Sequence, residues 1–165
     1  MTVRRVTVAA AIVAAVALVA WFFRMPGDEA SIRRRLQAFV DDVNRTSTQG
    51  LSSVSHAAAI GAYFTEDVRV DLGQGSTPID GRATVVGMAT RLQPRIAAYR
   101  LRFDDVTVQM APDGGSAEVH LAAEFIRQSV GAGEDWLDAR EFTLGMRRVG
   151  DEWSISRVTA IDTLR

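Results

Sequence analysis

The longest apolar run of the chain lies near its beginning, over residues 6–23, and it contains no charged side chain. Its only polar residue is Thr7. A helix rises about 1.5 Å per residue, so this run spans roughly 27 Å, close to the thickness of the hydrocarbon core of a bilayer. Because backbone groups in hydrocarbon must bond within their own segment, the pattern predicts one N-terminal transmembrane helix over residues 6–25.

The residues at both ends of this run indicate how it sits in a membrane. Basic and aromatic side chains typical of membrane interfaces flank it, namely Arg4, Arg5, Trp21, Phe22, Phe23 and Arg24. Residues 18–20 lack the small side chain expected three positions before a cleavage site, which favours an uncleaved signal anchor over a cleaved signal or a buried helix. Since the N-terminal tail, residues 1–5, is short and basic, we expect a single-pass inner (cytoplasmic) membrane protein whose C-terminal domain is periplasmic or extracytoplasmic.

After a predicted hinge at residues 26–30, the spacing of apolar residues predicts helices. Between Ile32 and Val43, apolar residues recur at helical spacing. A second short helix is expected from about residue 54 to 64, and a third from about residue 83 to 92, where Pro94 would end it. Between these two, residues 67–72 alternate between apolar and polar, which predicts a half-buried strand.

The second half of the chain alternates in the way that strands do. Four strands are expected, at residues 99–110, 117–126, 136–149 and 153–161. In the first of these the alternation slips at Asp104 and Asp105, and a β-bulge there would keep the apolar side chains on one face. Helices followed by consecutive antiparallel strands indicate an α+β domain, over residues 31–165, with its helices on one face of a curved sheet.

Three stretches, in this order and spacing, resemble the NTF2-like superfamily, also called SnoaL-like or cystatin-like. They are Ala62–Val70 (AYFTEDVRV), Ile79–Ala83 (IDGRA) and Gly150–Ile155 (GDEWSI). The resemblance implies a cone of three helices packed on a curved, mostly antiparallel sheet. It also implies frequent dimerisation through the sheet, and functions that range from isomerases, dehydratases and epoxide hydrolases to non-catalytic transport and secretion components.

Composition and charge narrow the possible functions. The formal net charge is −1, with acidic and basic residues interspersed, so no nucleic-acid-binding surface is expected. The chain has no cysteine, which excludes disulfides, zinc–thiolate sites and thiol nucleophiles. Its two histidines, His56 and His120, do not have the spacing of metal ligands, so we predict neither a metal site nor a cofactor.

Candidate catalytic residues can be sought through the likeness to ketosteroid isomerase, a member of this superfamily. The position of its tyrosine falls on Phe39, and that of its catalytic base falls on Leu72. Phenylalanine cannot donate a hydrogen bond and leucine cannot accept a proton, so this mechanism is not expected. His120 lies on the outer strand face, where Glu118 or Glu124 could orient it. We therefore predict no catalytic residue.

Residues that could line the interior of such a cone are Phe39, Tyr63, Phe103, Asp105, Phe125 and Phe142. Three hypotheses about function remain open. The leading one is a membrane-anchored, non-catalytic module for protein interaction or assembly, which we expect to form a homodimer and to bind a protein partner. The others are a binder of a small apolar ligand in the cone, and a SnoaL-like isomerase or hydrolase. An open apolar cavity favours the ligand binder, a buried carboxylate–tyrosine or carboxylate–histidine pair in an open cavity favours the enzyme, and a plugged cone favours the partner module.

Overall fold

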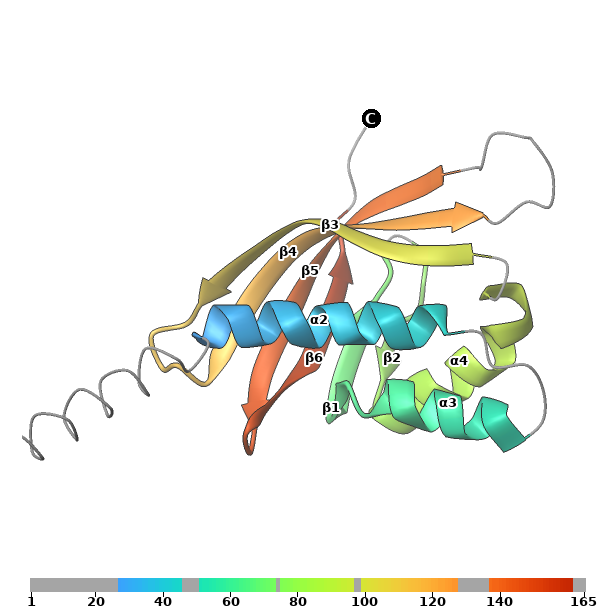
Figure 1. The fold of residues 1–165 in the computed structure, drawn as a ribbon, viewed down its shortest axis with the longest axis horizontal. Coiled ribbons are helices and arrows are strands. Elements are labelled where there is room, and N and C mark those ends of the chain that lie inside the picture. The colour runs from blue at the N-terminus through green and yellow to red at the C-terminus, as the bar shows by residue number, and fades with distance from the viewer. Residues whose placement is uncertain (1–26, 46–50, 74, 97–98, 128–136, 162–165) are drawn as a thin grey trace, which may run out of the picture.

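A computed structural model describes residues 27–45, 51–73, 75–96, 99–127 and 137–161 (Figure 1). The predicted transmembrane helix and its flanking residues lie outside these ranges. Within these ranges, no helix combines the length and the apolar character needed to cross a membrane. The described residues therefore belong to the C-terminal domain.

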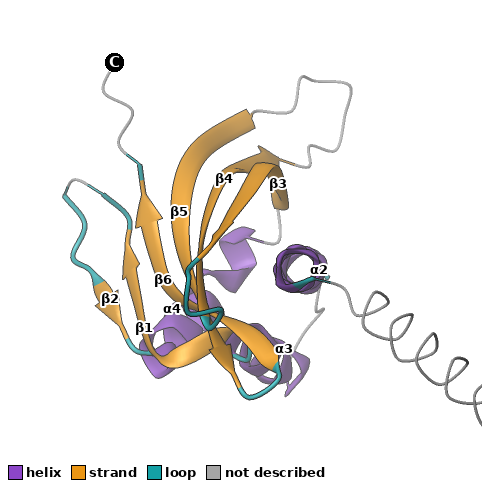
Figure 2. Ribbon diagram, turned by 90° about the vertical axis from the view of Figure 1, so that its left-hand side faces the viewer, coloured by secondary structure: helices purple, strands orange, loops and turns teal. Residues whose placement is uncertain are grey.

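The described residues form an α+β fold in which three helices pack on a curved six-stranded sheet (Figure 2). The sheet order is β2-β1-β6-β5-β4-β3. The pairing of β1 with β6 is parallel, and every other neighbouring pair is antiparallel. The elements are α2 (Asp28–Asn44), α3 (Leu51–Gly61), β1 (Phe64–Asp71), β2 (Ile79–Asp80), α4 (Arg82–Ile96), β3 (Tyr99–Met110), β4 (Ser116–Arg127), β5 (Leu137–Val149) and β6 (Glu152–Ala160).

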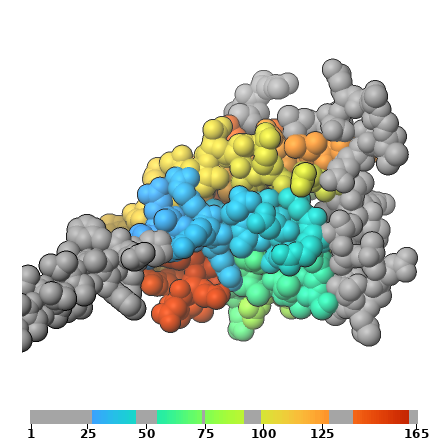
Figure 3. All heavy atoms as spheres, viewed as in Figure 1, coloured from blue at the N-terminus to red at the C-terminus, as the bar shows by residue number. Residues whose placement is uncertain are grey.

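Helix α2 supplies the central contact between the helices and the sheet. Ile32, Leu36 and Val40 are buried at helical spacing along one face of it. They belong to one core with inward-facing strand residues such as Val119 of β4 and Met146 of β5. Figure 3 shows the blue residues of α2 on the face toward the viewer, next to the yellow residues of β3.

The same helix also covers the open edge of β3, which is the last strand of the sheet. Arg33 Nη1 donates a hydrogen bond of 2.6 Å to the carbonyl of Val106. Near the other end of the helix, the side-chain amide of Asn44 bonds the backbone of Leu101. Edge strands expose unpaired backbone groups, so these side chains both protect the edge and set the position of α2.

The predicted β-bulge in β3 is confirmed. Asp104 pairs with Ala122 and Thr107 pairs with His120, so two residues of β3 oppose one residue of β4. Asp105, one of the two, has a φ of 52°, a left-handed conformation that aspartate tolerates better than most residues. The bulge keeps the apolar residues on either side of it directed toward the helices.

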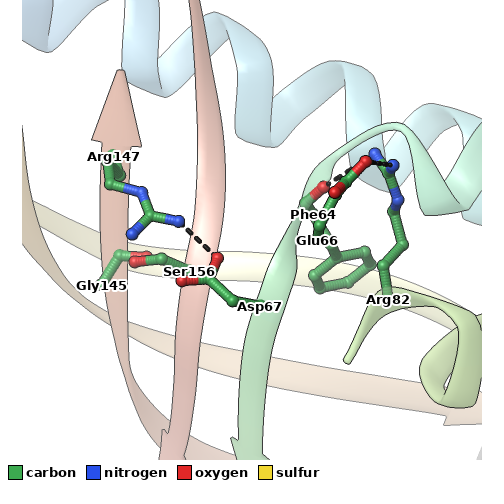
Figure 4. Close-up of polar contacts among 7 residues, drawn as sticks. All are labelled: Phe64, Glu66, Asp67, Arg82, Gly145, Arg147 and Ser156. Carbon is green, nitrogen blue, oxygen red and sulfur yellow. Dashed lines mark hydrogen bonds and ion pairs between the residues drawn. The ribbon is translucent and has the colours of Figure 1, made fainter. Parts of the chain in front are cut away.

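A second bulge lies between β5 and β6. Gly145 pairs with Arg157 but Met146 pairs with Ile155, which leaves Ser156 as an extra residue. The hydroxyl of Ser156 donates to the carbonyl of Gly145 at 3.1 Å (Figure 4). Such a bulge bends the strand and increases its twist, and it contributes to the curvature of the sheet.

Strand β1 is held from both sides by side-chain contacts (Figure 4). At the start of α4, Arg82 lies 3.0 Å from the carboxylate of Glu66 and donates to the carbonyl of Phe64 at 3.5 Å. On the other side, Arg147 of β5 forms an ion pair with Asp67. Exposed ion pairs contribute little free energy, so we assign these contacts a role in positioning the strand.

Three predicted element boundaries were wrong. Residues 28–30, part of the expected hinge, belong to helix α2, which begins at Asp28. The second helix ends at Gly61, and Phe64, which was expected to end it, begins β1. The reason is tertiary, because the N–H of Ile155 in β6 donates to the carbonyl of Tyr63 at 2.8 Å and draws the chain into the sheet. Helix α4 continues through Pro94 to Ile96, so the proline lies within the last turn of the helix and does not end it.

Candidate functional site

A cavity of about 400 Å³ lies between the three helices and the concave face of the sheet. This volume falls within the range of small-molecule sites. Aliphatic side chains make up much of its wall, among them Val85 of α4, Leu121 of β4 and Leu144 of β5. Aromatic side chains supply the rest of its apolar lining, namely Phe39, Phe64, Tyr99, Phe103, Phe125 and Phe142. The described residues of the cone therefore enclose a cavity.

Phe39 of α2 lines the cavity and is the centre of an aromatic cluster. Its ring is nearly parallel to that of Phe103, with centroids 6.1 Å apart and an interplanar angle of 18°. The rings of Tyr63 and Phe64 meet it edge to face, at 5.4 and 5.7 Å. Both arrangements are favoured by the charge distribution of aromatic rings. The cluster joins α2 to the start of β1 and to β3.

The polar residues of the lining are Asn44, Arg45, His56, Tyr99 and Arg100. Both ends of the Asn44 amide are bonded to Leu101. Arg45 Nη1 lies 3.1 Å from Asp42, which compensates its charge. Arg100 pairs with Ile126 in the sheet, and strand alternation directs its side chain to the outer face, away from the side chains of its neighbours.

His56 and Tyr99 differ from Asn44 and Arg45 of the lining in lacking an interaction partner in the described part of the chain. Both are half-buried, and neither has a hydrogen-bond or ion-pair partner among the described residues. The described residues of the lining include no aspartate or glutamate. The cavity thus presents an imidazole and a phenol as its available polar groups, with no carboxylate to accept a proton.

The carboxylate–tyrosine pair of this domain lies beside the cavity and outside its lining. The hydroxyl of Tyr63 donates to Asp42 at 2.6 Å, and the guanidinium of Arg35 lies 4.4 Å from the centre of the tyrosine ring. Burial, followed by the hydrogen bond to Asp42 and its negative charge, raises the pKa of Tyr63 to about 12. Arg35 also donates to the carbonyl of Ala62 at 3.0 Å. These contacts connect α2 to the residues that lead into β1, so we assign them a structural role.

Comparison with known proteins agrees with this architecture. The family model of the SnoaL-like domain matches residues 53–159. The chain belongs to the SnoaL-like domain family. Among curated protein sequences, none matches it.

Solved structures share the fold of this SnoaL-like domain at low sequence identity. A candidate scytalone dehydratase from Novosphingobium aromaticivorans is 14% identical, with a TM-score of 0.64 over 83% of this chain and 85% of that chain. An NTF2-like protein with a cystatin-like fold from the same organism is 18% identical, with a TM-score of 0.64 over 88% and 90%. An NTF2-like protein of unknown function from Shewanella oneidensis is 15% identical, with a TM-score of 0.62 over 80% and 97%.

The residues expected to line the cone occupy different places in this SnoaL-like domain. Phe39, Phe103, Phe125 and Phe142 line the cavity. Tyr63 is buried against Asp42, and Asp105 is exposed in the bulge of β3, so both lie outside the lining. The expected membrane-interface residues lie outside the described residues, namely Arg4, Arg5, Trp21, Phe22, Phe23 and Arg24.

The histidine on the sheet occupies the outer face, as its strand position predicts. His120 Nε2 lies 2.9 Å from Glu118 Oε1, and its Nδ1 lies 3.2 Å from the hydroxyl of Thr143. These partners lie on the side of the sheet opposite the cavity. A group of acidic and histidine residues that could hold a metal ion is not found in the described ranges.

His56 and Tyr99 were not among the expected lining residues, although the sequence contains a signal for each. His56 precedes Ile60 by four residues and therefore shares its helix face. Tyr99 alternates in phase with Leu101 and Phe103, which puts all three on one face of the strand. Both signals concern which face a residue occupies, and only the packing shows that this face borders a cavity.

Proposed function

We propose that this SnoaL-like domain binds a small apolar ligand in the cavity of its cone. The observation that carries the proposal is an open cavity of about 400 Å³ whose wall is formed mainly by aliphatic and aromatic side chains. A bound apolar ligand would bury this surface, and burial of apolar surface is favourable by roughly 25 cal/mol per Å². An open cone also argues for ligand binding over a role in assembly alone.

The chemistry of the lining favours binding over catalysis. Acid–base catalysis of dehydration or isomerisation needs a group that accepts a proton and one that donates it. The described lining has His56 and Tyr99 but no carboxylate to orient the imidazole. The Tyr63–Asp42 pair is occupied outside the cavity. One structural neighbour is named a candidate scytalone dehydratase, but its low identity supports the shared fold and not the reaction.

We further propose that the domain binds its ligand at the inner membrane. In our proposal residues 6–25 anchor the domain to the inner membrane, so that it would take up apolar molecules close to the bilayer in which they dissolve. A homodimer and a protein partner also remain predictions. The support for the anchor is the apolar run over residues 6–23, and the support for a homodimer is the resemblance to a superfamily that often dimerises.

The test is binding of N-phenyl-1-naphthylamine, a neutral dye that fluoresces in apolar surroundings, to the purified full-length chain. Ala123 of β4 is buried and lines the cavity, whereas Ala122 faces the outer side of the sheet. We expect saturable binding to the wild type, about tenfold weaker binding to Ala123→Leu, a loss of roughly 1.4 kcal/mol, and unchanged binding to the matched control Ala122→Leu.

Two further measurements keep the result interpretable. Thermal unfolding of each variant shows whether it is folded. Dye binding is also measured for Ala57→Leu, a second substitution that fills the same cavity, in this case from α3. Any medium used to keep the full chain soluble is titrated alone, so that dye dissolved in it is subtracted. Absence of saturable binding to the wild type, or equal weakening in Ala123→Leu and Ala122→Leu, contradicts the proposal.

A further inference from the structure

The chain has two histidines and two tyrosines, and the fold divides each pair in the same way. One histidine and one tyrosine line the cavity, His56 from α3 and Tyr99 from the first position of β3. The other two lie outside it and already have partners. His120 contacts Glu118, and Tyr63 donates to Asp42.

His56 and Tyr99 line the cavity, where a hydrogen-bond partner on a ligand would contribute to the free energy of binding. Both side chains are half-buried against an apolar wall and lack a hydrogen-bond partner among the described residues. A buried donor or acceptor that loses water without gaining a partner costs about 1–3 kcal/mol. A ligand that supplies the partner removes this cost, whereas a purely hydrocarbon ligand imposes it. His56 and Tyr99 can therefore discriminate between ligands of the same size.

The charges around the cavity indicate that the partner group is neutral. Arg45 is compensated by Asp42 at 3.1 Å, and strand alternation directs the side chain of Arg100 to the outer face. No acidic side chain belongs to the described lining. A ligand carboxylate would be desolvated here without an uncompensated cation to receive it, which is costly. A hydroxyl can both donate and accept, as can a neutral imidazole and a phenol.

We propose that His56 and Tyr99 determine specificity by hydrogen bonding to a neutral oxygen group on an otherwise apolar, ring-containing ligand. This inference rests on the proposed function, because it names the class of ligand that the same cavity takes. The rings of that ligand pack against the aromatic wall. Phe39 and Phe103, whose rings are stacked with an interplanar angle of 18°, both line the cavity, and aromatic rings pack favourably against one another in offset or edge-to-face arrangements.

The test compares 2-naphthol with 2-methylnaphthalene, which have the same rings and differ by a hydroxyl in place of a methyl group. Dissociation constants for both are measured on the full-length chain and on four variants. His56→Phe and Tyr99→Phe remove the polar groups of the cavity. His120→Phe and Tyr63→Phe make the same changes outside it and serve as matched controls.

We expect the preference for 2-naphthol over 2-methylnaphthalene to fall by about three- to tenfold in the two cavity variants, which is the value of one hydrogen bond, and to stay unchanged in the controls. A fall in either cavity variant supports the proposal and identifies the side chain that bonds the hydroxyl. In NMR spectra of the wild type, 2-naphthol should shift the ring signals of His56 and leave those of His120 in place.

The opposing outcomes are distinguishable. If both compounds bind but the preference is the same in the wild type and in all four variants, the cavity binds apolar ligands and the role given to His56 and Tyr99 is overturned. The same holds if the controls change as much as the cavity variants. If neither compound binds the wild type, the proposed function fails together with this inference.

Discussion

The side-chain amide of Asn44 forms two hydrogen bonds with the backbone of Leu101, each 2.8 Å long. One is donated by Nδ2 to the carbonyl and the other is accepted by Oδ1 from the N–H. The amide thereby satisfies both backbone groups of an edge-strand residue, as a neighbouring strand would. Because Asn44 ends α2 and Leu101 lies near the start of β3, this contact fixes two walls of the cavity relative to each other.

Replacing Asn44 with alanine should therefore destabilise the domain. The change leaves the part-buried N–H and carbonyl of Leu101 without this partner, at a cost of about 2–3 kcal/mol in the free energy of unfolding. Chemical denaturation measures it. Gln37→Ala on the same helix is the control, since the exposed Gln37 bonds Asp41 and its loss should cost about 0.5 kcal/mol or less. Equal losses in the two variants would show that the paired amide contact has no special weight.

A pair of glycines provides a test of how closely the helices pack. A methyl group at Gly61, the last residue of α3, would lie 2.5 Å from Cγ2 of Val86 in α4. Gly61→Ala should therefore force the helices apart and lower the free energy of unfolding by about 1–3 kcal/mol. At Gly87, inside α4, the same methyl group meets nothing within 4 Å. Gly87→Ala should stabilise the domain by about 0.5–1 kcal/mol, because alanine favours helix.

Thermal or chemical unfolding of these two variants gives the sign of each change directly. The opposite signs are the essential result, since both substitutions add one methyl group to a helical glycine. Destabilisation by Gly87→Ala, or tolerance of Gly61→Ala, would contradict the close packing of α3 against α4 at Gly61 and the open space at Gly87.

The pKa of Tyr63 predicts a loss of stability at alkaline pH. Burial and the hydrogen bond to Asp42 raise this pKa from 10.0 to about 12. Folding therefore favours the protonated phenol, so the stabilisation is complete below pH 10 and is lost as the pH rises toward 12, when the unfolded chain ionises first. The difference of pKa corresponds to roughly 2–3 kcal/mol.

The titration is best measured in a Tyr99→Phe background, where Tyr63 is the only tyrosine of the chain. The ultraviolet absorbance of tyrosinate should then appear with a single midpoint near pH 12. Adding Asp42→Asn removes the negative charge and should lower that midpoint toward the ordinary value. A midpoint near 10 before this second substitution would show that Tyr63 is neither buried nor bonded as described.

Much of the fold follows from local patterns in the sequence. Tyr99, Leu101 and Phe103 are out of phase with Val106 and Val108, and this slip was sufficient to predict the bulge in β3. Local patterns failed where a distant segment decided the outcome. Tyr63 and Phe64 continue a helical pattern in the sequence, but pairing with β6 draws them out of the helix.

The candidate site was predicted in part for the same reason. Phe39, Phe103 and Phe125 have the spacing of inward-facing residues, and they do face the cavity. Nothing in the spacing of Tyr63 shows that its hydroxyl turns to Asp42 and away from the hollow. His56 was not among the residues expected to line the cone, yet it lines the cavity.

By itself, the sequence determined the order of the helices and of every strand except the two-residue β2, the apolar face of most of these elements, and the absence of cysteine chemistry. These properties depend on neighbours along the chain and on the fixed periods of helix and strand. Only the tertiary structure decided that the apolar faces enclose a cavity of about 400 Å³ and that their side chains do not fill the space between helices and sheet. That volume depends on the separation of segments far apart in the chain, which is set by contacts such as Asn44 with Leu101 and by the curvature that the bulges impose on the sheet.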